Sequence, residues 1–340
     1  MARIALDAMG GDHAPQATVA GALLAAAELD PSHSILLVGQ AERIEATLDA
    51  LLAGELAALA PHRPRLHVVD APDVIAMAEK PSAAIRSKPN SSMMVGLRLH
   101  AEGQCDAFVS AGNTGAQMAA SMVLLKLHEG LKRPAIATIF PTAERPVVVL
   151  DSGANVDCAA AELVQFARLG AVYAHDVLGR ETPAVGLLNI GEEPEKGDTV
   201  SKEAHALLAQ SGLNFVGNVE GRDLPAGRSH QAALDVVVCD GFVGNVILKF
   251  YEAVAPLMVG LLVKAGFEQD RIMRALRDLD YSEYGGAPLL GVRGISIICH
   301  GRSSPRAIKS ALKVAVQAVD SRLDEHIGKR LAAPQSGAAA

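Results

Sequence analysis

The sequence contains no tryptophan, and aromatic residues make up only 3% of it. Aromatic platforms on which nucleic-acid bases stack are therefore not expected. The formal net charge of −7 at pH 7 also argues against a nucleic-acid-binding protein, because such proteins usually carry an excess of positive charge. The chain is therefore not expected to bind nucleic acid.

Cysteine is scarce and widely spaced. The four cysteines, Cys105, Cys158, Cys239 and Cys299, form no CxxC pair. Free thiols in a reducing cytoplasm fit this spacing better than a disulfide framework or a zinc site. Cys239 lies within the apolar run "VVVCD" and is expected to be a small core residue, not a nucleophile.

Several familiar catalytic motifs are also missing. The sequence has no GxGxxG after its first apolar run, no GxxxxGK[ST] and no GxSxG, and its 11 histidines form no HExxH. These absences argue against a dinucleotide cofactor, P-loop nucleotide binding, a serine-hydrolase elbow and a zinc centre. No cofactor and no metal are expected.

Long apolar runs are absent as well. The longest candidate, "VAPLMVGLLV" at 254–263, contains a proline and is about half the ~20 residues that span a bilayer. The beginning, "MARIALDAMGGD", reaches Asp7 too soon for a signal peptide. A soluble, cytoplasmic protein is therefore expected. With 340 residues, half of them hydrophobic, the chain can build a sizeable core.

Short β-rich runs alternate with helical patterns along most of the chain. Runs such as "VVVLD" and "DVVVCD" are apolar almost throughout, as expected for strands covered on both faces. Strands are predicted at 3–9, 34–39, 66–70, 106–111, 135–140, 146–151, 184–190 and 235–240. Helices are predicted at 15–29, 41–59, 91–102, 114–128, 158–178, 199–210, 244–265, 270–279 and 305–330.

This alternation predicts an α/β fold of three layers (α/β/α) around a mostly parallel, Rossmann-like sheet. Neither a polar linker nor a repeat of fixed period occurs. We expect one continuous domain over residues 1–330, with a division into two lobes left open, and a disordered tail over residues 331–340.

Glycine occurs together with Asp, Asn or Ser in five turns that follow predicted strands. They read "DAMGGDHAP", "SAGNTGA", "DSGANVD", "NIGEEPEKGD" and "DGFVGN". In open α/β sheets ligands bind beyond the carboxyl ends of the strands, and glycine lets backbone N–H groups approach an anion closely. We therefore expect these turns to lie at one edge of a sheet and to form a binding site.

Each of these turns can be interpreted either as a helix cap or as an anion site, and "SAGNTGAQM" is an example. Taken alone, it supports a plain helix cap and an anion site about equally, since Thr and Asn are common at helix starts. The side chains of Ser110, Asn113 and Thr114 would add donors to the backbone amides. The other four turns favour the binding interpretation.

A positive charge for such a site has three candidates. Lys196 lies between Gly191 and Gly197 in a turn that leaves a predicted strand, although most lysines are simply solvated. Arg133 and Arg86 are further candidates that fit a surface position equally well. A site of small donors without a covalent nucleophile suits a reaction in which a bound anion attacks, with catalysis by positioning and oxyanion stabilisation.

Other polar residues near the turns have ordinary explanations. His13 follows "GGD" and His300 precedes "GRSS", so each could face the site, but a lone histidine usually satisfies a local hydrogen bond. Four aspartates at these turns could bind Mg²⁺, although capping of helices and anchoring of turns is favoured. They are Asp7, Asp12, Asp151 and Asp240.

Eight motifs together resemble the bacterial phosphate acyltransferase family, the acyl-acyl-carrier-protein:phosphate acyltransferases. They are "DAMGGDHAP", "DAFVSAGNTGA", "RPAIAT", "LDSGANVDC", "GLLNIGEEPEKG", "FVGNVEGRD", "VVVCDGFVGNVILK" and "YSEYGGAPLLGV". The likeness runs from Arg3 to about Asp320, and the combination is highly specific. Two stretches depart from the family pattern, "LPAGRSHQAALDVVV" and "HGRSSP", and both put local loop geometry in doubt more than activity.

The resemblance implies transfer of a long-chain acyl group from acyl carrier protein to inorganic phosphate, giving an acyl-phosphate for phospholipid synthesis. It implies a fold similar to the phosphotransacetylase and isocitrate/isopropylmalate dehydrogenase group, a homodimer and no nucleotide cofactor. It also leaves room for peripheral membrane association and for contact with the downstream glycerol-3-phosphate acyltransferase.

Carried onto this sequence, the family motifs assign residues to three roles. The catalytic residues would be Lys196, Asn189 and Asn245. The phosphate-binding residues would be Ser110, Gly112, Asn113, Thr114 and Gly115. Other substrate contacts would come from Asp7, Gly10, Gly11, Asp151, Asn155, Asn218, Gly241 and Gly244.

A local basic cluster is expected to dock the acidic carrier protein, although a solvated helix face fits it too. Its members are Lys264, Arg271, Arg274 and Arg277. The apolar segment before it suits a core helix, a dimer contact, an acyl tunnel or a membrane contact. Two rival functions remain: a phosphotransacetylase-like enzyme that uses acyl-coenzyme A, and a non-catalytic regulator that binds acyl groups or phosphate.

Overall fold

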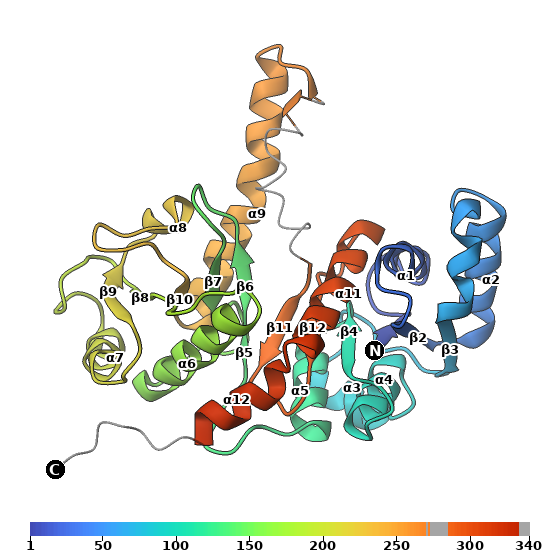
Figure 1. Ribbon diagram of the computed structural model, residues 1–340, viewed down its shortest axis with the longest axis horizontal. Coiled ribbons are helices and arrows are strands. Elements are labelled where there is room, and N and C mark those ends of the chain that lie inside the picture. Colours follow the sequence, from blue (N-terminus) through green and yellow to red (C-terminus); the bar gives the residue numbers. More distant parts are fainter. Residues whose placement is uncertain (270, 273–284, 333–340) are drawn as a thin grey trace. The chain divides into compact units, whose positions relative to one another are not determined.

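The computed structural model describes residues 1–269, 271–272 and 285–332 (Figure 1). The chain forms two compact units, each built from two separate segments. The first unit comprises Met1–His128 and Tyr284–Asp324, and the second comprises Glu129–Glu283 and Glu325–Ala340. Most of the predicted helix at 270–279 and of the predicted disordered tail lies outside the described residues.

The first unit contains a sheet with the strand order β3-β2-β1-β4-β12-β11. Its neighbours are parallel except for the antiparallel pair of β11 and β12. The strands are β1 (Arg3–Asp7), β2 (Ser34–Gly39), β3 (Leu66–Asp70), β4 (Ala107–Ser110), β11 (Ala287–Leu290) and β12 (Ser296–Ile298).

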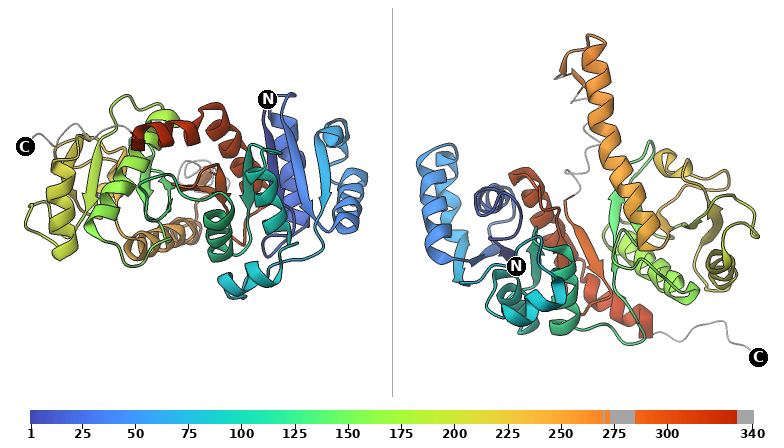
Figure 2. Two further views of the ribbon diagram at one scale, coloured as in Figure 1. Left: turned by 90° about the horizontal axis from the view of Figure 1, so that it is seen from below. Right: turned by 180° about the vertical axis from the view of Figure 1, so that it is seen from behind.

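Helices cover both faces of this sheet (Figure 2). They are α1 (Gln16–Glu28), α2 (Ala41–Ala53), α3 (Pro81–Ser87), α4 (Ser92–Ala101), α5 (Thr114–Leu124) and α11 (Pro305–Asp320), with a 3-10 helix, η1 (Ala57–Arg65). The central strands β1 and β4 are buried almost throughout, which explains their continuous apolar sequences. Helices α1 and α11 approach closely because Gly21 has no Cβ, which would otherwise lie 2.6 Å from the Cβ of Ile308.

The second unit contains a sheet with the order β6-β7-β10-β8-β9, parallel except for the pair of β6 and β7. Its strands are β6 (Thr138–Phe140), β7 (Val147–Leu150), β8 (Val185–Leu188), β9 (Phe215–Val219) and β10 (Val236–Val238), preceded in the chain by β5 (Ala135–Ile136). Its helices are α6 (Ala160–Asp176), α7 (Thr199–Ala209), α8 (Asp223–Ala226) and α9 (Gly241–Lys264), and α12 (Leu323–Ala332) follows α11. Phe140, Val149, Val219 and Val237 belong to its buried apolar core.

The expected α/β fold with mostly parallel strands is confirmed, but the strands form two sheets and not one. The prediction that the five glycine-rich turns lie at one edge of a single sheet is therefore wrong. Those after β1 and β4 belong to the first unit, and those after β7, β8 and β10 belong to the second. Sequence patterns missed β9, β11 and β12, because these runs are short and β9 and β11 contain glycine or proline.

Two predicted helices are interrupted in the structure. The one at 41–59 ends at Ala53 and gives way to η1, which contains Pro61 and Pro64. The one at 305–330 divides into α11 and α12 where Arg322 adopts a positive φ of 53°. Proline and left-handed residues both interrupt α-helical hydrogen bonding.

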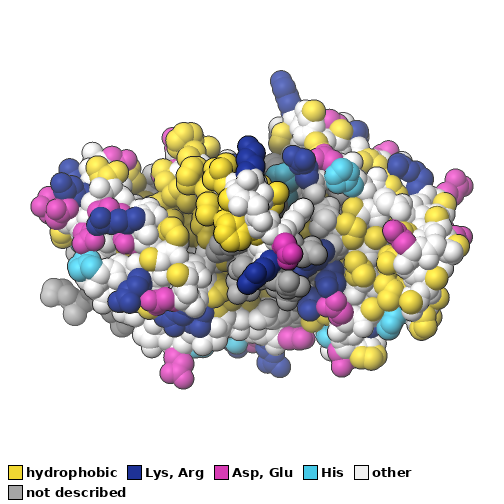
Figure 3. All heavy atoms as spheres, turned by 90° about the horizontal axis from the view of Figure 1, so that it is seen from above, with side chains coloured by type: hydrophobic (Ala, Val, Ile, Leu, Met, Phe, Trp, Pro, Cys, Tyr) yellow, Lys and Arg dark blue, Asp and Glu magenta, His cyan; other side chains and the backbone are white. Residues whose placement is uncertain are grey.

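Helix α9 is long, apolar and exposed for most of its length (Figure 1). Only Gly241 and Gly244 in its first turn are buried, so its apolar sequence does not make it a core helix of this chain. Hydrophobic side chains gather over α9 on the face drawn in Figure 3, and Phe250 is 71% exposed. By length and composition alone, α9 is the one helix among the described residues that reaches the size of a membrane span.

Candidate active site

The turns after β1 and β4 pack directly against each other through a buried carboxyl group. The hydroxyl of Ser110 donates to Asp7 Oδ2 at 2.7 Å and accepts from the N–H of Gly112 at 3.0 Å. A Cβ on Gly10 would lie 2.6 Å from Asp7 Oδ2 and 2.8 Å from the nitrogen of Gly112. Gly10 is therefore required for the packing of these two turns.

Asp7 is only 2% exposed, and burial raises its carboxyl pKa above the usual value of 3.8. Hydrogen bonds from Ser92, Ser110 and the N–H groups of Met9 and Gly10 act against this rise. Because the folded protein binds the Asp7 proton more tightly than the unfolded chain does, the stabilisation from Asp7 is complete below its unfolded pKa. It is lost as the pH rises through the folded pKa.

We therefore expect Asp7→Asn to gain stability relative to the wild type as the pH rises above 3.8, with no further change once the folded pKa is passed. Urea unfolding between pH 4 and 8, followed by circular dichroism, measures this difference. Asp49→Asn, at an exposed carboxylate on α2, is the control. A stability difference for Asp7→Asn that does not change with pH would contradict the assignment.

Asn113 caps helix α5 and also binds the backbone of the segment at 77–79. Its Oδ1 accepts from the N–H of Ala116 at 3.0 Å. Its Nδ2 donates to the carbonyl oxygens of Met77 at 3.0 Å and Glu79 at 2.9 Å. The side chain therefore already binds backbone on both sides. The other N–H groups of the first turn of α5, those of Thr114 and Gly115, have no acceptor within the helix and are suited to an anion.

Sequence patterns missed Gln117, which lies one turn further along α5. It is fully buried, and its Nε2 donates to Ser296 Oγ at 3.1 Å and to the carbonyl oxygen of Ile297 at 3.0 Å. Its Oε1 is buried without a hydrogen-bond partner in the described part of the chain. The spacing of three and four residues from Thr114 and Asn113, on one helix face, was the available signal.

In the second unit, the turn after β7 is organised around Asp151. Its Oδ2 accepts from the N–H of Asn155 at 2.6 Å and from Asn155 Nδ2 at 2.9 Å. Its Oδ1 accepts from the N–H groups of Ile136 and Ala154, both at 3.0 Å. Burial raises the pKa of Asp151 despite these hydrogen bonds. Asp151 thus anchors a turn, which was the favoured interpretation for the aspartates.

The first turn of α9 packs onto this same turn. A Cβ on Gly241 would lie 2.7 Å from the carbonyl oxygen of Asn155, and a Cβ on Gly244 would overlap the carbonyl oxygen of Asp151. Asp240 caps α9 by accepting from the N–H of Val243 at 2.9 Å. The exposed side chain of Asn245 lies beside Gly153, with a Cβ built on Gly153 at 3.5 Å from the Asn245 Cβ.

The loop at 190–197 presents Lys196, whose side chain is exposed. Asn189 holds the loop by donating from Nδ2 to the carbonyl oxygen of Lys196 at 3.1 Å and accepting the N–H of Ile190 at 2.8 Å. Asn218 Nδ2 donates to the carbonyl oxygen of Glu193 at 2.7 Å. Asn189 and Asn218 therefore both bind the backbone of the loop that carries Lys196.

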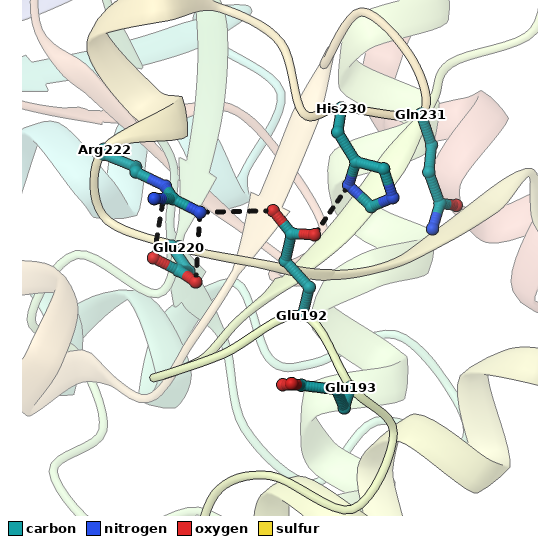
Figure 4. Close-up of a pocket in the computed structure, with 6 residues that line it drawn as sticks. All are labelled: Glu192, Glu193, Glu220, Arg222, His230 and Gln231. Carbon is teal, nitrogen blue, oxygen red and sulfur yellow. Dashed lines mark hydrogen bonds and ion pairs between the residues drawn. The ribbon is translucent and has the colours of Figure 1, made fainter.

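A pocket of about 410 Å³ opens beside this loop (Figure 4). Its lining residues are Glu192, Glu193, Glu220, Arg222, His230 and Gln231. Figure 4 shows Glu192 between Arg222 and His230, with nitrogen–oxygen distances of 3.4 and 2.9 Å. Arg222 is 69% exposed, so these ion pairs contribute little to holding the loop.

The remaining candidate residues lie at ordinary positions. Arg133 pairs with Glu162 at 3.2 Å, Arg86 is exposed on α3, and His13 and His300 are exposed. The thiol of Cys239 is buried, which raises its pKa well above 9.0 and fits a core residue. Of the carrier-docking candidates, Lys264 and Arg271 are exposed, whereas Arg274 and Arg277 lie outside the described residues.

The turn after β1 requires glycine at position 11, because the backbone there has a positive φ and lies close to Gly301. The φ of Gly11 is +106°, and a Cβ there would lie 3.0 Å from the carbonyl oxygen of Gly301, which also accepts the N–H of Asp12 at 2.7 Å. A Cβ on Gly112 would lie 3.0 Å from the methyl carbon of Met93. Like Gly10, these glycines allow backbone segments to meet at the candidate site.

Comparison with known proteins gives a consistent picture. The family model described as "Fatty acid synthesis protein" matches residues 2–325. A curated phosphate acyltransferase from Desulforamulus reducens is 50% identical over 333 residues, covering 95% of both chains. Another, from Heliobacterium modesticaldum, is 49% identical over 341 residues, covering 96% of this chain and 97% of the relative.

Solved structures of similar fold include two acyl-transferring enzymes. A phosphotransacetylase from Streptococcus pyogenes has a TM-score of 0.60 at 16% identity and covers 94% of each chain. A branched-chain phosphotransacylase from Enterococcus faecalis has a TM-score of 0.59 at 17% identity, covering 94% of this chain and 99% of that one. These likenesses confirm the expected phosphotransacetylase-like fold. The family model and the relatives that match nearly the whole sequence show that this chain belongs to the phosphate acyltransferase family.

Proposed function

We propose that this protein transfers a long-chain acyl group from acyl carrier protein to inorganic phosphate. The observation that carries the proposal is the match to curated phosphate acyltransferases, half identical over nearly the whole chain. The relatives' name states the acceptor and the transferred group. Acyl carrier protein as donor, and phospholipid synthesis as destination, follow from the resemblance of the motifs.

The reaction needs no covalent enzyme intermediate. A phosphate oxygen attacks the thioester carbonyl carbon, a C–O bond forms, and the carbonyl oxygen becomes an oxyanion. Collapse of this intermediate breaks the C–S bond, and the phosphate proton passes to the departing carrier thiolate. The products are acyl-phosphate and the free thiol of the carrier. Catalysis then rests on positioning and on stabilising the developing negative charge.

The residues divide between these tasks. We assign phosphate binding to the 110–115 turn, chiefly to the first-turn N–H groups of α5, because the side chains of Ser110 and Asn113 already have partners. Lys196, exposed on its loop, supplies the positive charge that stabilises the transition state. Asn245, exposed at the start of α9, is assigned to the thioester carbonyl.

The basic residues at and beyond the end of α9 suit docking of an acidic carrier protein, because opposite charges steer association. Lys264 and Arg271 are exposed and available for this contact.

The homodimer is assigned to the exposed apolar side chains of α9, since patches of this kind usually mark an interface. In sedimentation velocity we expect the wild-type protein to be a dimer and the Phe250→Glu variant to be a monomer. A monomeric wild-type protein would contradict this assignment. A membrane surface is the other candidate for the same helix.

Purified protein with palmitoyl-carrier protein and phosphate should release carrier thiol and form acyl-phosphate, which hydroxylamine traps as the hydroxamate. No product from this protein under conditions where the Desulforamulus reducens relative makes it would overturn the proposal. Faster turnover of palmitoyl-coenzyme A would favour the phosphotransacetylase-like alternative. Binding of both substrates without turnover would favour a regulator.

A further inference from the structure

The backbone of Lys196 is fixed at both of its polar groups, whereas its side chain is exposed and runs over Gly191, with Cγ 2.9 Å from a Cβ built there. The Lys196 N–H donates to the carbonyl oxygen of Glu193 at 3.1 Å. Its own carbonyl oxygen accepts from Asn189 Nδ2 at 3.1 Å. A fixed backbone limits the region that the lysine ammonium group can reach, and this favours its presentation to a reacting group.

Asn218 takes part in one of these two hydrogen-bonding arrangements, the one at the carbonyl oxygen of Glu193. Its Nδ2 donates at 2.7 Å to the Glu193 carbonyl oxygen, the same atom that accepts the Lys196 N–H. Asn218 is only 3% exposed, and its hydrogen bond to the exposed Glu193 backbone is partly shielded from water. The side chain of Asn218 and the backbone N–H of Lys196 therefore share one acceptor, the carbonyl oxygen of Glu193.

An irregularity in strand β9 brings Asn218 to this place. Val185 of β8 pairs with Phe215 of β9, and Leu187 pairs with Asn218. One residue of β8 lies between these pairs, whereas two residues of β9 do, and one of them, Gly217, has a φ of +90°. This β-bulge shifts the alternation of side chains along β9 by one position, as bulges beside active sites often do.

The Oδ1 atom of Asn218, unlike its Nδ2, does not hold the loop. It is buried and has no hydrogen-bond partner among the residues that the structure describes. An unpaired buried acceptor disfavours folding, and an apolar side chain of similar size would avoid that penalty. The donor to Glu193 is what asparagine adds at this position.

We propose that Asn218 is a positioning residue for Lys196: it holds the Glu193 carbonyl so that the 190–197 loop presents the lysine to the reacting groups. This inference rests on the proposed function, in which Lys196 stabilises transition-state charge. It replaces direct substrate contact, the role that the family motifs suggested for Asn218, with action through the loop. Asn189 serves the same loop from its other side.

A double-mutant cycle tests this role. Asn218→Asp has the same shape but turns the donor into an acceptor that repels the Glu193 carbonyl oxygen. We expect it to lower kcat by up to about 100-fold, the effect of a displacement of about 1 Å, while KM for the carrier substrate stays close to the wild-type value. In a Lys196→Ala background the same change should alter kcat by less than about threefold, because the positioned group is gone.

The matched control is Asn214→Asp, which makes the same chemical change at an exposed amide that donates to the carbonyl oxygen of Thr182 at 3.3 Å. It should leave kcat unchanged. Asn218→Ala, which removes the donor without adding charge, is measured in the same cycle in case Asn218→Asp folds poorly. Losses that add fully to that of Lys196→Ala would overturn the positioning role and leave the proposed reaction standing.

Hydrogen exchange provides a readout that needs no activity. Asn218→Asp should speed amide exchange across 190–197, above all at the Lys196 N–H, and leave exchange in α6 unchanged. Unchanged exchange in the loop would overturn the inference even if the enzyme is active. Faster exchange in a protein that makes no acyl-phosphate would support the loop attachment while the proposed function fails.

Discussion

Replacing Lys196 by alanine is expected to lower kcat about 10²- to 10³-fold, the effect of removing one preorganised group that stabilises an oxyanion. The lysine is exposed and its backbone is fixed, so its charge is available to the substrate and contributes little to folding. The loss should therefore appear in kcat, with a small change in melting temperature. Steady-state release of carrier thiol at saturating phosphate measures it.

Lys202→Ala provides the control for Lys196→Ala. Lys202 is an exposed lysine on α7, and its removal takes away the same charge from the same unit. It should leave kcat within about twofold of the wild type, as expected of surface substitutions away from special features. If Lys196→Ala behaved like Lys202→Ala, the catalytic role of Lys196 would be wrong.

Gly244→Ala is expected to destabilise the second unit by about 3 kcal/mol or more, at the upper end for overpacked sites. The new Cβ would overlap the carbonyl oxygen of Asp151, and neither group can move easily. The oxygen belongs to a turn fixed by four hydrogen bonds to Asp151, and Gly244 is one of the two buried residues in the first turn of α9. Activity should fall as well, because the same turn and helix carry Asn155 and Asn245.

Gly260→Ala separates this clash from the general effect of alanine in a helix. Gly260 lies on the same helix, and a Cβ there would meet no atom within 4 Å. Because alanine favours helix by about 1 kcal/mol over glycine, Gly260→Ala should be neutral or slightly stabilising. Thermal unfolding followed by circular dichroism compares the two. Equal melting temperatures for both variants would contradict the close packing of Gly244.

The sequence predicted the parts of the fold that depend on local patterns. Continuous apolar runs marked the central strands, and β2 and β3 agree with their predicted bounds to the residue. The division into two sheets was not predictable, because strand neighbours depend on contacts between distant residues. The glycine-rich turns look alike whether they share one sheet or belong to two.

The candidate site was predicted by residue type more readily than by role. Asparagine after a strand indicated a polar turn, but nothing local shows that Asn113 binds the carbonyl oxygens of Met77 and Glu79. Nor does the sequence show that Asn218 reaches the Lys196 loop, because this depends on the bulge in β9. Likewise, the apolar composition of α9 fits a buried and an exposed helix equally well.

The first unit is completed by a strand that comes late in the chain. Strand β12 pairs with β4 and follows the entire segment from Glu129 to Glu283. While the chain is being made on the ribosome, β4 is therefore left as an open sheet edge until β12 emerges. Open edges of this kind invite pairing with other chains, and contacts between distant segments form slowly. Newly made protein thus keeps this edge unpaired while the segment between β4 and β12 is translated, and we expect the chain to be most prone to aggregation during that stage.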